Sequence, residues 1–240
     1  MAAADVGPED SVLEIGPGTG TLTRVLAETA GRVVAVELDD SLFRLLQSDF
    51  ADAGNVTLIH GNALSVDPCS IFNGSYKLVA NIPYYITGPI VRHYLEAACS
   101  PSVMVLMVQR EVGLRMVARP GDLSLLGISV QWYAKARIIA RVPAGAFYPP
   151  PKVDSVIIQL TPRELGDRAA LTDTFFELAK AGFAMRRKQL LNALSSGLHL
   201  ERSDVARVLE AAGIAPTRRA ESLSLDEWTR LATVRKASGS

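Results

Sequence analysis

The sequence is poor in cysteine and histidine, and no apolar run in it approaches the roughly 18 residues of a membrane-spanning helix. Cys69 and Cys99 are its 2 cysteines and form no Cys-x-x-Cys pair, which fits a reducing compartment without a bound metal. The 3 histidines are scattered, so a zinc site is not expected. The first residues have the pattern of neither a signal peptide nor a basic transit peptide. We therefore expect a soluble, cytoplasmic protein without a metal.

The chain also lacks net charge, because 25 Lys and Arg balance 25 Asp and Glu. The balance hides a gradient: residues 1–80 carry −7, residues 81–160 carry +4, residues 161–182 carry −1 and residues 183–240 carry +4. An acidic first third and basic later parts suit a cationic small ligand at one end and a polyanion at the other. Scattered, solvated charge is the competing interpretation.

Alternating strands and helices in the first third predict a parallel sheet that is covered on both faces. Ser11–Ile15 has the pattern of a short strand, and the glycine-rich segment Gly16–Gly20 and a helix follow it. Glycine lets the backbone approach a ligand closely, and the start of a helix offers unpaired N–H groups. The loop is therefore a candidate ligand site.

The second predicted strand, Val33–Val36, ends in Glu37, 21 residues after Gly16. A ribose-binding acid is expected at roughly this distance, about 20 residues. An ordinary strand-end carboxylate is the alternative. A dinucleotide fingerprint would place its third glycine one residue beyond Gly20, and Pro17 lies inside the loop. A nicotinamide dehydrogenase is therefore disfavoured.

Two further strands end in amides. Val56–His60 is followed by Asn62, which either hydrogen-bonds an adenine edge or forms a turn after Gly61. The apolar run Leu78–Ala80 leads into Asn81-Ile82-Pro83-Tyr84, whose amide and ring lie where open α/β sheets bind ligands. An Asx-Pro turn with surface tyrosines explains the same residues.

The middle of the chain contains a stiff connection. We expect helices at Ile90–Ala97 and Arg110–Ala118 and strands at Val103–Val108, Lys135–Val142 and Val153–Leu160. The prolines between the last two strands exclude a central strand and place Phe147 and Tyr148 on a rigid rim beside Lys152. A rigid hairpin linker would explain the prolines alone.

The end of the chain has a helical pattern, with a boundary near residues 163–170. Helices are expected at Leu171–Leu194, from Ser203 to Gly213, and after a capping box at Ser224–Glu227. The basic clusters 186–188 and 218–219 suit a nucleic-acid clamp, and a solvated helix face is the competing interpretation.

Together these motifs resemble the KsgA-type small-subunit rRNA adenine N6-dimethyltransferases, over nearly the whole chain. The motifs are Glu14–Gly20 with Leu22-Thr23, Val36–Asp39, Asn81–Tyr84, Phe147–Ser155, Phe183–Leu190 and Arg219–Ser224. The resemblance implies a Rossmann-like class I methyltransferase sheet, parallel with a C-terminal antiparallel hairpin strand, followed by a small all-helical domain. We place the S-adenosylmethionine-binding domain at 1–165 and the helical RNA-binding domain at 166–240.

The resemblance also implies the donor, the acceptor and the residues that hold them. S-adenosylmethionine would be the methyl donor and become S-adenosylhomocysteine, and two adjacent adenines near the 3′ end of 16S rRNA in an immature 30S particle would be the acceptors. The expected donor-binding residues are Glu14, Gly16, Gly18, Glu37, Leu38, Asn62, Ala63 and Asn81. The expected catalytic residues are Asn81, Ile82, Pro83, Tyr84 and Phe147. The expected RNA-binding residues are Lys152, Arg186, Arg187, Lys188, Arg218 and Arg219.

The chemistry of adenine suits this assignment. The N6 lone pair is delocalised into the ring, so the amine is a poor nucleophile. The Asn81 side-chain oxygen and the Ile82 carbonyl would accept both N–H bonds and turn the lone pair towards the methyl group. Such alignment supplies about 7–11 kcal/mol in favourable cases. Stacking of the base on Tyr84 and Phe147 would offset part of the cost of extruding it, about 1–3 kcal/mol per base.

Two departures from the family pattern bear on function. The family usually begins with a Gln-Asn-Phe-Leu segment that covers the donor, whereas this sequence starts only about ten residues before the first predicted strand. Position 62, usually an acid, is Asn62, which accepts a hydrogen bond less strongly. A non-catalytic RNA-binding or ribosome-assembly factor, or an adenine methyltransferase acting on another rRNA, are the alternatives. A monomer is expected.

Overall fold

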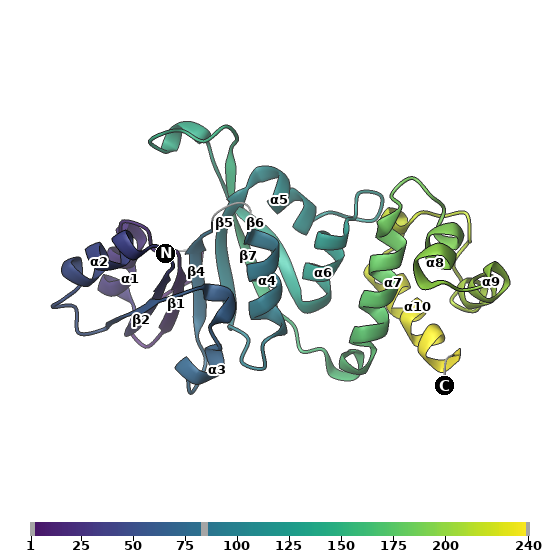
Figure 1. Cartoon of the computed structure of the whole chain (residues 1–240), viewed down its shortest axis with the longest axis horizontal. Coiled ribbons are helices and arrows are strands. Elements are labelled where there is room, and N and C mark those ends of the chain that lie inside the picture. The colour runs from purple at the N-terminus through teal and green to yellow at the C-terminus, as the bar shows by residue number, and fades with distance from the viewer. Residues whose placement is uncertain (1–2, 83–85, 239–240) are drawn as a thin grey trace. The chain divides into compact units, whose positions relative to one another are not determined.

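The computed structural model describes residues 3–82 and 86–238 (Figure 1). Its sheet has seven strands in the order β3-β2-β1-β4-β5-β7-β6. The pairs β3–β2, β2–β1, β1–β4 and β4–β5 are parallel, whereas β7 lies antiparallel to both β5 and β6. The predicted α/β sheet, parallel with an antiparallel hairpin from later in the chain, is confirmed.

The strands and helices have the following bounds. The strands are β1 Ser11–Ile15, β2 Arg32–Glu37, β3 Val56–His60, β4 Lys77–Asn81, β5 Val103–Gln109, β6 Ala134–Val142 and β7 Ser155–Pro162. The helices are α1 Thr21–Thr29, α2 Asp40–Asp49, α3 Pro68–Ile71, α4 Thr87–Glu96, α5 Arg110–Met116, α6 Leu125–Tyr133, α7 Thr172–Ala184, α8 Leu190–Leu198, α9 Arg202–Ala211 and α10 Leu225–Ser238. The 3₁₀ turns within the described residues include η1 Ala63–Ser65, η3 Ala144–Ala146, η4 Gly166–Leu171 and η5 Ala220–Ser222.

The inner strands are buried on both faces, which explains their nearly continuous apolar sequences. On one face Val12, Val33 and Val79 join Leu26 of α1 in a single apolar cluster. Successive side chains of a strand point to opposite faces, so the alternate residues face the other layer of helices. Because the inner strands are parallel, their carboxyl ends share one edge of the sheet.

The described residues form two compact units. The sheet unit consists of residues 1–114 and 134–163, and the helical unit consists of residues 115–133 and 164–240. The sequence placed the division after residue 165; in the structure the last change of unit is at residue 163, and α6 also belongs to the helical unit. The sequence did not predict α6, because its run Leu125–Tyr133 is apolar without helical alternation. Ile128 and Trp132 of this helix are fully buried.

The helical unit has its own core, in which Trp132 stacks on Phe175 with ring centroids 3.8 Å apart. The single helix predicted at 171–194 is wrong: α7 ends at Ala184, and α8 begins at Leu190. Met185 leaves the helical conformation at φ −123° and ψ 72°. The break lets α8 fold back against α7. The two helices approach closely at Gly197, where an added Cβ would lie 2.7 Å from the Cβ of Ala181.

The predicted capping box at the start of α10 is confirmed. The backbone N–H of Ser224 donates to Glu227 Oε2 at 2.7 Å, and the backbone N–H of Glu227 donates to Ser224 Oγ at 3.2 Å. These reciprocal bonds satisfy two N–H groups that the first helical turn would leave unpaired. The capping box therefore fixes where α10 begins.

Cys69 and Cys99 are joined by a disulfide, with their Cα atoms 5.3 Å apart. The sequence had suggested a reducing compartment for these two residues, so a bonded pair was not expected. The 30 residues between them give no sign of proximity, because the fold alone brings the end of α4 beside α3. Within the described ranges, no helix is both long enough and apolar enough to cross a membrane.

Candidate active site

The glycine loop after β1 is open on the side where a ligand would approach. Gly16 and Gly18 have φ values of 64° and 61°, a conformation that favours glycine, and a Cβ added to either would meet no atom within 4 Å. Gly20, at φ 77°, instead packs closely, since its Cβ would lie 2.8 Å from the Phe50 ring. The Gly16 N–H donates to the carbonyl of Val36 at 3.0 Å and ties the loop to β2.

Glu37 is held over this loop by backbone hydrogen bonds. Its Oε2 accepts from the N–H of Gly18 at 3.1 Å, and its Oε1 accepts from Leu38 at 2.8 Å and Asp39 at 2.9 Å. The residue is only 7% exposed, whereas the apolar side chain of Leu38 is 64% exposed. Because a carboxylate has about four acceptor positions, Glu37 retains capacity for further donors. Leu38 offers an apolar surface next to it.

Glu14 is a second carboxyl group at this end of the sheet, and it is buried in β1 at 1% exposure. Burial raises its pKa to about 7, and the neighbouring charge of Glu37 acts in the same direction. Its Oε2 has no hydrogen-bond partner among the described residues. A buried carboxylate without a partner is costly, so this position suits a cationic or hydrogen-bond-donating ligand group.

The residues that follow β3 form a turn whose hydrogen bonds are made within the protein. Asn62 caps η1, since its Oδ1 accepts from the Leu64 N–H at 2.9 Å. Ala63 is buried, and its carbonyl accepts from the Tyr94 hydroxyl at 2.8 Å. The turn-forming interpretation therefore accounts for the oxygen of Asn62. The predicted contact of Asn62 with the donor's adenine stays a prediction.

Strand registers place the candidate residues at one level. Ile15 pairs with Val36 on one side and with Ala80 on the other. Gly16, Glu37 and Asn81 are the residues that directly follow these three partners, so they lie at the same height along the strands. Adjacent strands lie about 4.8 Å apart, which puts the loop and the two side chains within reach of one small ligand. Asn81 is exposed at the end of β4, whereas Ile82 is 1% exposed and anchors the chain. Pro83 and Tyr84 lie outside the described residues.

Phe147 lies on the loop between β6 and β7, which extends beyond the sheet (Figure 1). Val142, at the end of β6, pairs with Ser155, and Ser155 pairs with Gln109 at the carboxyl end of β5. The loop therefore emerges at the same edge as Asn81. Phe147 is half-buried, and Tyr148, which precedes a cis proline bond, is fully exposed.

A carboxylate that the sequence did not single out anchors this loop. Asp154 Oδ1 accepts from the Ala144 N–H at 3.0 Å, its Oδ2 accepts from the guanidinium of Arg141, and its carbonyl accepts from the Arg110 N–H at 2.9 Å. The hydrogen bond with Arg141 is the largest of the causes that lower the pKa of Asp154. Asp154 belongs to the motif Phe147–Ser155, so the available signal was its position in that motif.

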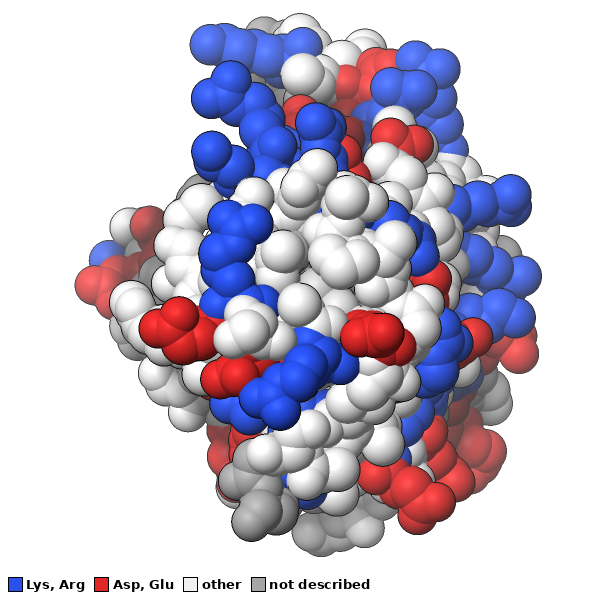
Figure 2. Space-filling view, turned by 90° about the vertical axis from the view of Figure 1, so that its right-hand side faces the viewer, with Lys and Arg blue, Asp and Glu red and all other residues white. Residues whose placement is uncertain are grey.

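The predicted RNA-binding cations divide into two groups. Arg186, Arg187 and Lys188 are exposed between α7 and α8, and Lys152 is exposed on the β6–β7 loop. Figure 2 shows Lys and Arg side chains gathered in the upper part of the face that it presents. The exposed side chains of Lys152 and of Arg186–Lys188 are available to a polyanion.

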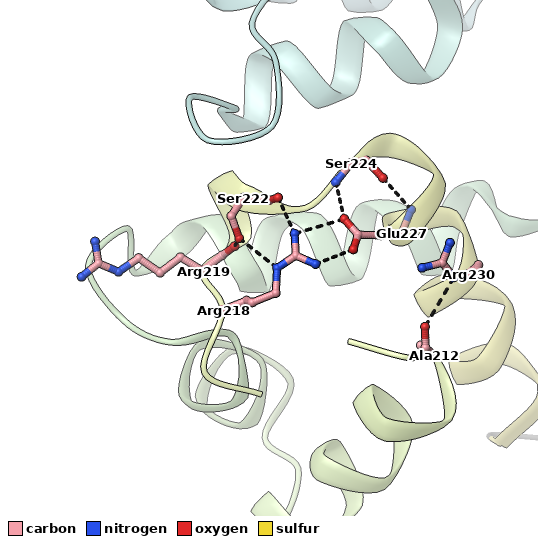
Figure 3. A network of polar contacts seen from close by, with 7 residues as sticks. All are labelled: Ala212, Arg218, Arg219, Ser222, Ser224, Glu227 and Arg230. Atoms are coloured by element: carbon pink, nitrogen blue, oxygen red, sulfur yellow. Dashed lines mark hydrogen bonds and ion pairs between the residues drawn. The ribbon is translucent and has the colours of Figure 1, made fainter. Parts of the chain in front are cut away.

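Arg218, by contrast, is occupied within the helical unit. Its guanidinium forms an ion pair with Glu227 and donates to the carbonyl of Ser222, as Figure 3 shows. The side chain of Arg218 is 32% exposed, and its hydrogen bond is the largest cause that lowers the pKa of Glu227. The adjacent Arg219 is 54% exposed and lies 3.8 Å from Glu221 Oε1. Arg218 therefore has a structural role that the sequence did not suggest.

The sheet order, the antiparallel hairpin and the glycine loop beneath a strand-end carboxylate define a methyltransferase of the Rossmann-like class. The sequence profile described as ribosomal RNA adenine dimethylase matches residues 1–235. The chain belongs to this family, and it is an rRNA adenine dimethyltransferase.

Individual relatives agree with this assignment. A protein of Dehalococcoides mccartyi named ribosomal RNA small subunit methyltransferase A is 47% identical over 98% of this chain and 81% of its own length. The protein of that name from Moorella thermoacetica is 44% identical over 95% of this chain and 84% of its own length.

Among solved structures, a dimethyladenosine transferase from Plasmodium falciparum has a TM-score of 0.84 at 26% identity, covering 99% of this chain and 94% of that one. The 23S rRNA methyltransferase ErmE has a TM-score of 0.72 at 26% identity, covering 97% of this chain and 93% of that one. The similarity to both structures extends through the helical unit.

Proposed function

We propose that this chain transfers methyl groups from S-adenosylmethionine to N6 of two adjacent adenines near the 3′ end of 16S rRNA, within immature small subunits in the cytoplasm. The observation that carries the proposal is the meeting of the open glycine loop, Glu37 and Asn81 at one edge of the sheet. The relatives named for the small subunit support this substrate, because they are 44–47% identical whereas ErmE is 26% identical.

The donor fits the residues at this edge. When bound, S-adenosylmethionine supplies an electrophilic methyl group on a positively charged sulfur. Gly16 and Gly18 leave open space for its methionine part, and the unpartnered carboxyl oxygen of Glu14 suits its cationic groups. Glu37 would accept hydrogen bonds from the ribose hydroxyls, and Leu38 and Ala63 would contact the adenine. The acidic charge of the first third favours a cationic ligand.

The acceptor base would be aligned by groups that carry no charge. Asn81 Oδ1 and the Ile82 carbonyl would each accept one N–H of the adenine amine, which directs its lone pair out of the ring plane towards the methyl group. Stacking on Phe147 and Tyr84 would hold the extruded base. Because the amide cannot take up a proton near pH 7, Asn81 acts by orientation and not as a general base.

RNA beyond the target base would be held by its phosphates. The exposed cations Lys152, Arg186, Arg187, Lys188 and Arg219 suit this role, since phosphate contacts position RNA without reading its sequence. We leave Arg218 out of this set, because Glu227 already pairs with it.

The central test replaces Asn81 by Ala. We expect methylation of unmethylated small subunits to fall more than about 100-fold, since alignment of the amine is lost. Calorimetry should show donor binding weakened by no more than a few-fold, because Asn81 is only one of the expected donor-binding residues. Asn73→Ala, which removes an exposed amide elsewhere in the sheet unit, is the matched control.

Two outcomes would contradict the proposal. Full methylation by the Asn81→Ala variant would remove Asn81 from the reaction. A wild-type chain that binds small subunits but no donor would favour the non-catalytic assembly factor.

A further inference from the structure

A pocket lies at the base of the β6–β7 loop, entirely within the sheet unit. It has a volume of about 370 Å³ and is lined by Gln109, Arg110, Glu111, Ala144, Lys152, Val153 and Asp154. These residues come from the end of β5, the start of α5 and the two ends of the loop that carries Phe147. None of them is among the residues expected to bind the donor.

The pocket is close to the place where the target base would lie. Asn81 pairs with Met107, and Gln109 is two residues further along β5 towards the same edge. With a rise of about 3.4 Å per residue and strands about 4.8 Å apart, the Cα atoms of Asn81 and Gln109 are separated by roughly 8 Å. The nucleotides that flank an extruded base at Asn81 would therefore pass this pocket.

The two cations of the pocket are free to bind an anion. Neither Arg110 nor Lys152 has a side-chain hydrogen bond or ion pair to any other described residue, and both are exposed. The charge of Arg110 also acts on Asp154, where it is the smallest of the causes that lower the pKa of that carboxyl group. The carboxylate of Asp154 is already engaged by Arg141 and the Ala144 N–H. Glu111 is the remaining acid of the lining. The lining therefore holds two cations and two acids, and Arg141, which lies outside the lining, already neutralises Asp154.

We propose that this pocket binds a backbone phosphate of the RNA next to the target adenine, with Arg110 and Lys152 as its ligands. The proposal deepens the proposed function and rests on it. A guanidinium can donate two parallel N–H bonds to a phosphate, and Lys152 adds a second charge from the β6–β7 loop. The phosphate contact would set the position of the strand, so that the neighbouring base reaches Asn81 and Phe147.

The test compares Arg110→Ala and Lys152→Ala with Lys135→Ala. Lys135 is an exposed cation on the same hairpin, but it pairs with Thr161 at the opposite end of the sheet. Affinity of the full chain for unmethylated small subunits is measured at several salt concentrations. We expect about tenfold weaker binding for each pocket variant, because a charged hydrogen bond is removed. The slope of log affinity against log salt should fall by about 0.7 for one single-strand phosphate.

Further measurements separate the possible outcomes. Arg110→Lys should recover most of the affinity that Arg110→Ala removes, and calorimetric donor binding should stay unchanged in every variant. The phosphate site would be refuted if the pocket variants matched Lys135→Ala in affinity and salt slope. The proposed function would stand if these variants still methylated small subunits. A wild-type chain that neither binds donor nor methylates would overturn the proposed function itself.

Discussion

At the scale of single residues, the two carboxyl groups of the site, Glu14 and Glu37, differ in their hydrogen bonding. Three backbone N–H groups hold the Glu37 carboxylate, whereas Glu14 has an oxygen without any partner among the described residues. Burial without such hydrogen bonds favours the neutral form of a carboxyl group, and burial is the largest cause that raises the pKa of Glu14. Glu37 is therefore oriented to accept hydrogen bonds from a ligand, and Glu14 has a pKa of about 7.

The raised pKa of Glu14 predicts a pH-dependent stability. Below about pH 4.5 the carboxyl group is protonated in both states; between about 4.5 and about 7 it is ionised only in the unfolded chain. The free energy of unfolding should therefore fall as pH rises through this window, by about 3 kcal/mol for this group. Glu14→Gln should remove that dependence, as measured by denaturant unfolding at pH 5 and pH 8.

Glu28→Gln, on the surface of α1, is the control for this experiment. It removes a carboxylate of ordinary exposure and should leave the difference in stability between the two pH values unchanged. An equal difference in wild type and Glu14→Gln would refute the assignment of the pH dependence to Glu14.

At the scale of elements, the loop between β6 and β7 depends on one side chain. Asp154, at the β7 end of the loop, joins it to the β6 end through the Ala144 N–H and Arg141, and its carbonyl accepts a hydrogen bond from the Arg110 N–H. Phe147 lies between these anchors, so its place at the sheet edge depends on them. Asp154 is a positioning residue for the base-stacking ring.

Asp154→Ala should lower kcat for methylation by about 10- to 100-fold, since a displaced stacking ring misaligns the base. Donor binding should be unchanged, because none of the expected donor-binding residues lies on the β6–β7 loop. Steady-state kinetics with calorimetry on the same samples would measure both. Asp52→Ala, an exposed acid after α2, is the control.

A double variant gives a sharper result. Arg141→Ala combined with Asp154→Ala should cost little more than Asp154→Ala alone, since the two residues act through one ion pair. Fully additive losses would contradict a shared role in the loop.

The elements could be predicted from the sequence where local pattern and tertiary structure agree. The strands ending at Ile15, Glu37, His60 and Asn81 follow from apolar runs that stop at polar residues. The break between α7 and α8 could not be predicted, because residues 185–189 contain neither glycine nor proline and Arg, Lys and Gln are good helix formers. The role of Asp154 likewise depends on contacts between segments that the sequence does not place together.

At the scale of the whole molecule, acidic and basic residues are concentrated in different parts of the chain. The first 80 residues are acidic and hold every donor-binding candidate except Asn81, whereas exposed cations occur on the β6–β7 loop and in the helical unit. Strand register places Gly16, Glu37 and Asn81 at one edge of the sheet, while their roles stay predictions. The sequence could not sort the predicted RNA contacts, because no local pattern distinguishes the occupied Arg218 from the exposed Arg219.

Replacing Arg186, Arg187 and Lys188 together by Ala should weaken binding to small subunits and reduce the salt slope by about 0.7 for each RNA phosphate that is no longer bound. Stability should change little, because these side chains are exposed. Filter binding across a salt series and thermal unfolding would measure the two effects. A control that replaces Lys180, Arg202 and Arg207, three other exposed cations of the helical unit, should have the smaller effect. Equal slopes in the two triple variants would refute a specific role for 186–188.

The insertion of α6 before the last two strands determines how this protein can be divided. The chain changes unit at residues 114, 133 and 163, so the helical unit is not an appendage that follows the sheet. A cut after residue 163 would leave Trp132 and Ile128 without Phe175 and the rest of their core. Exchange of the helical unit between relatives therefore requires both of its segments, 115–133 and 164–240, to be transplanted together.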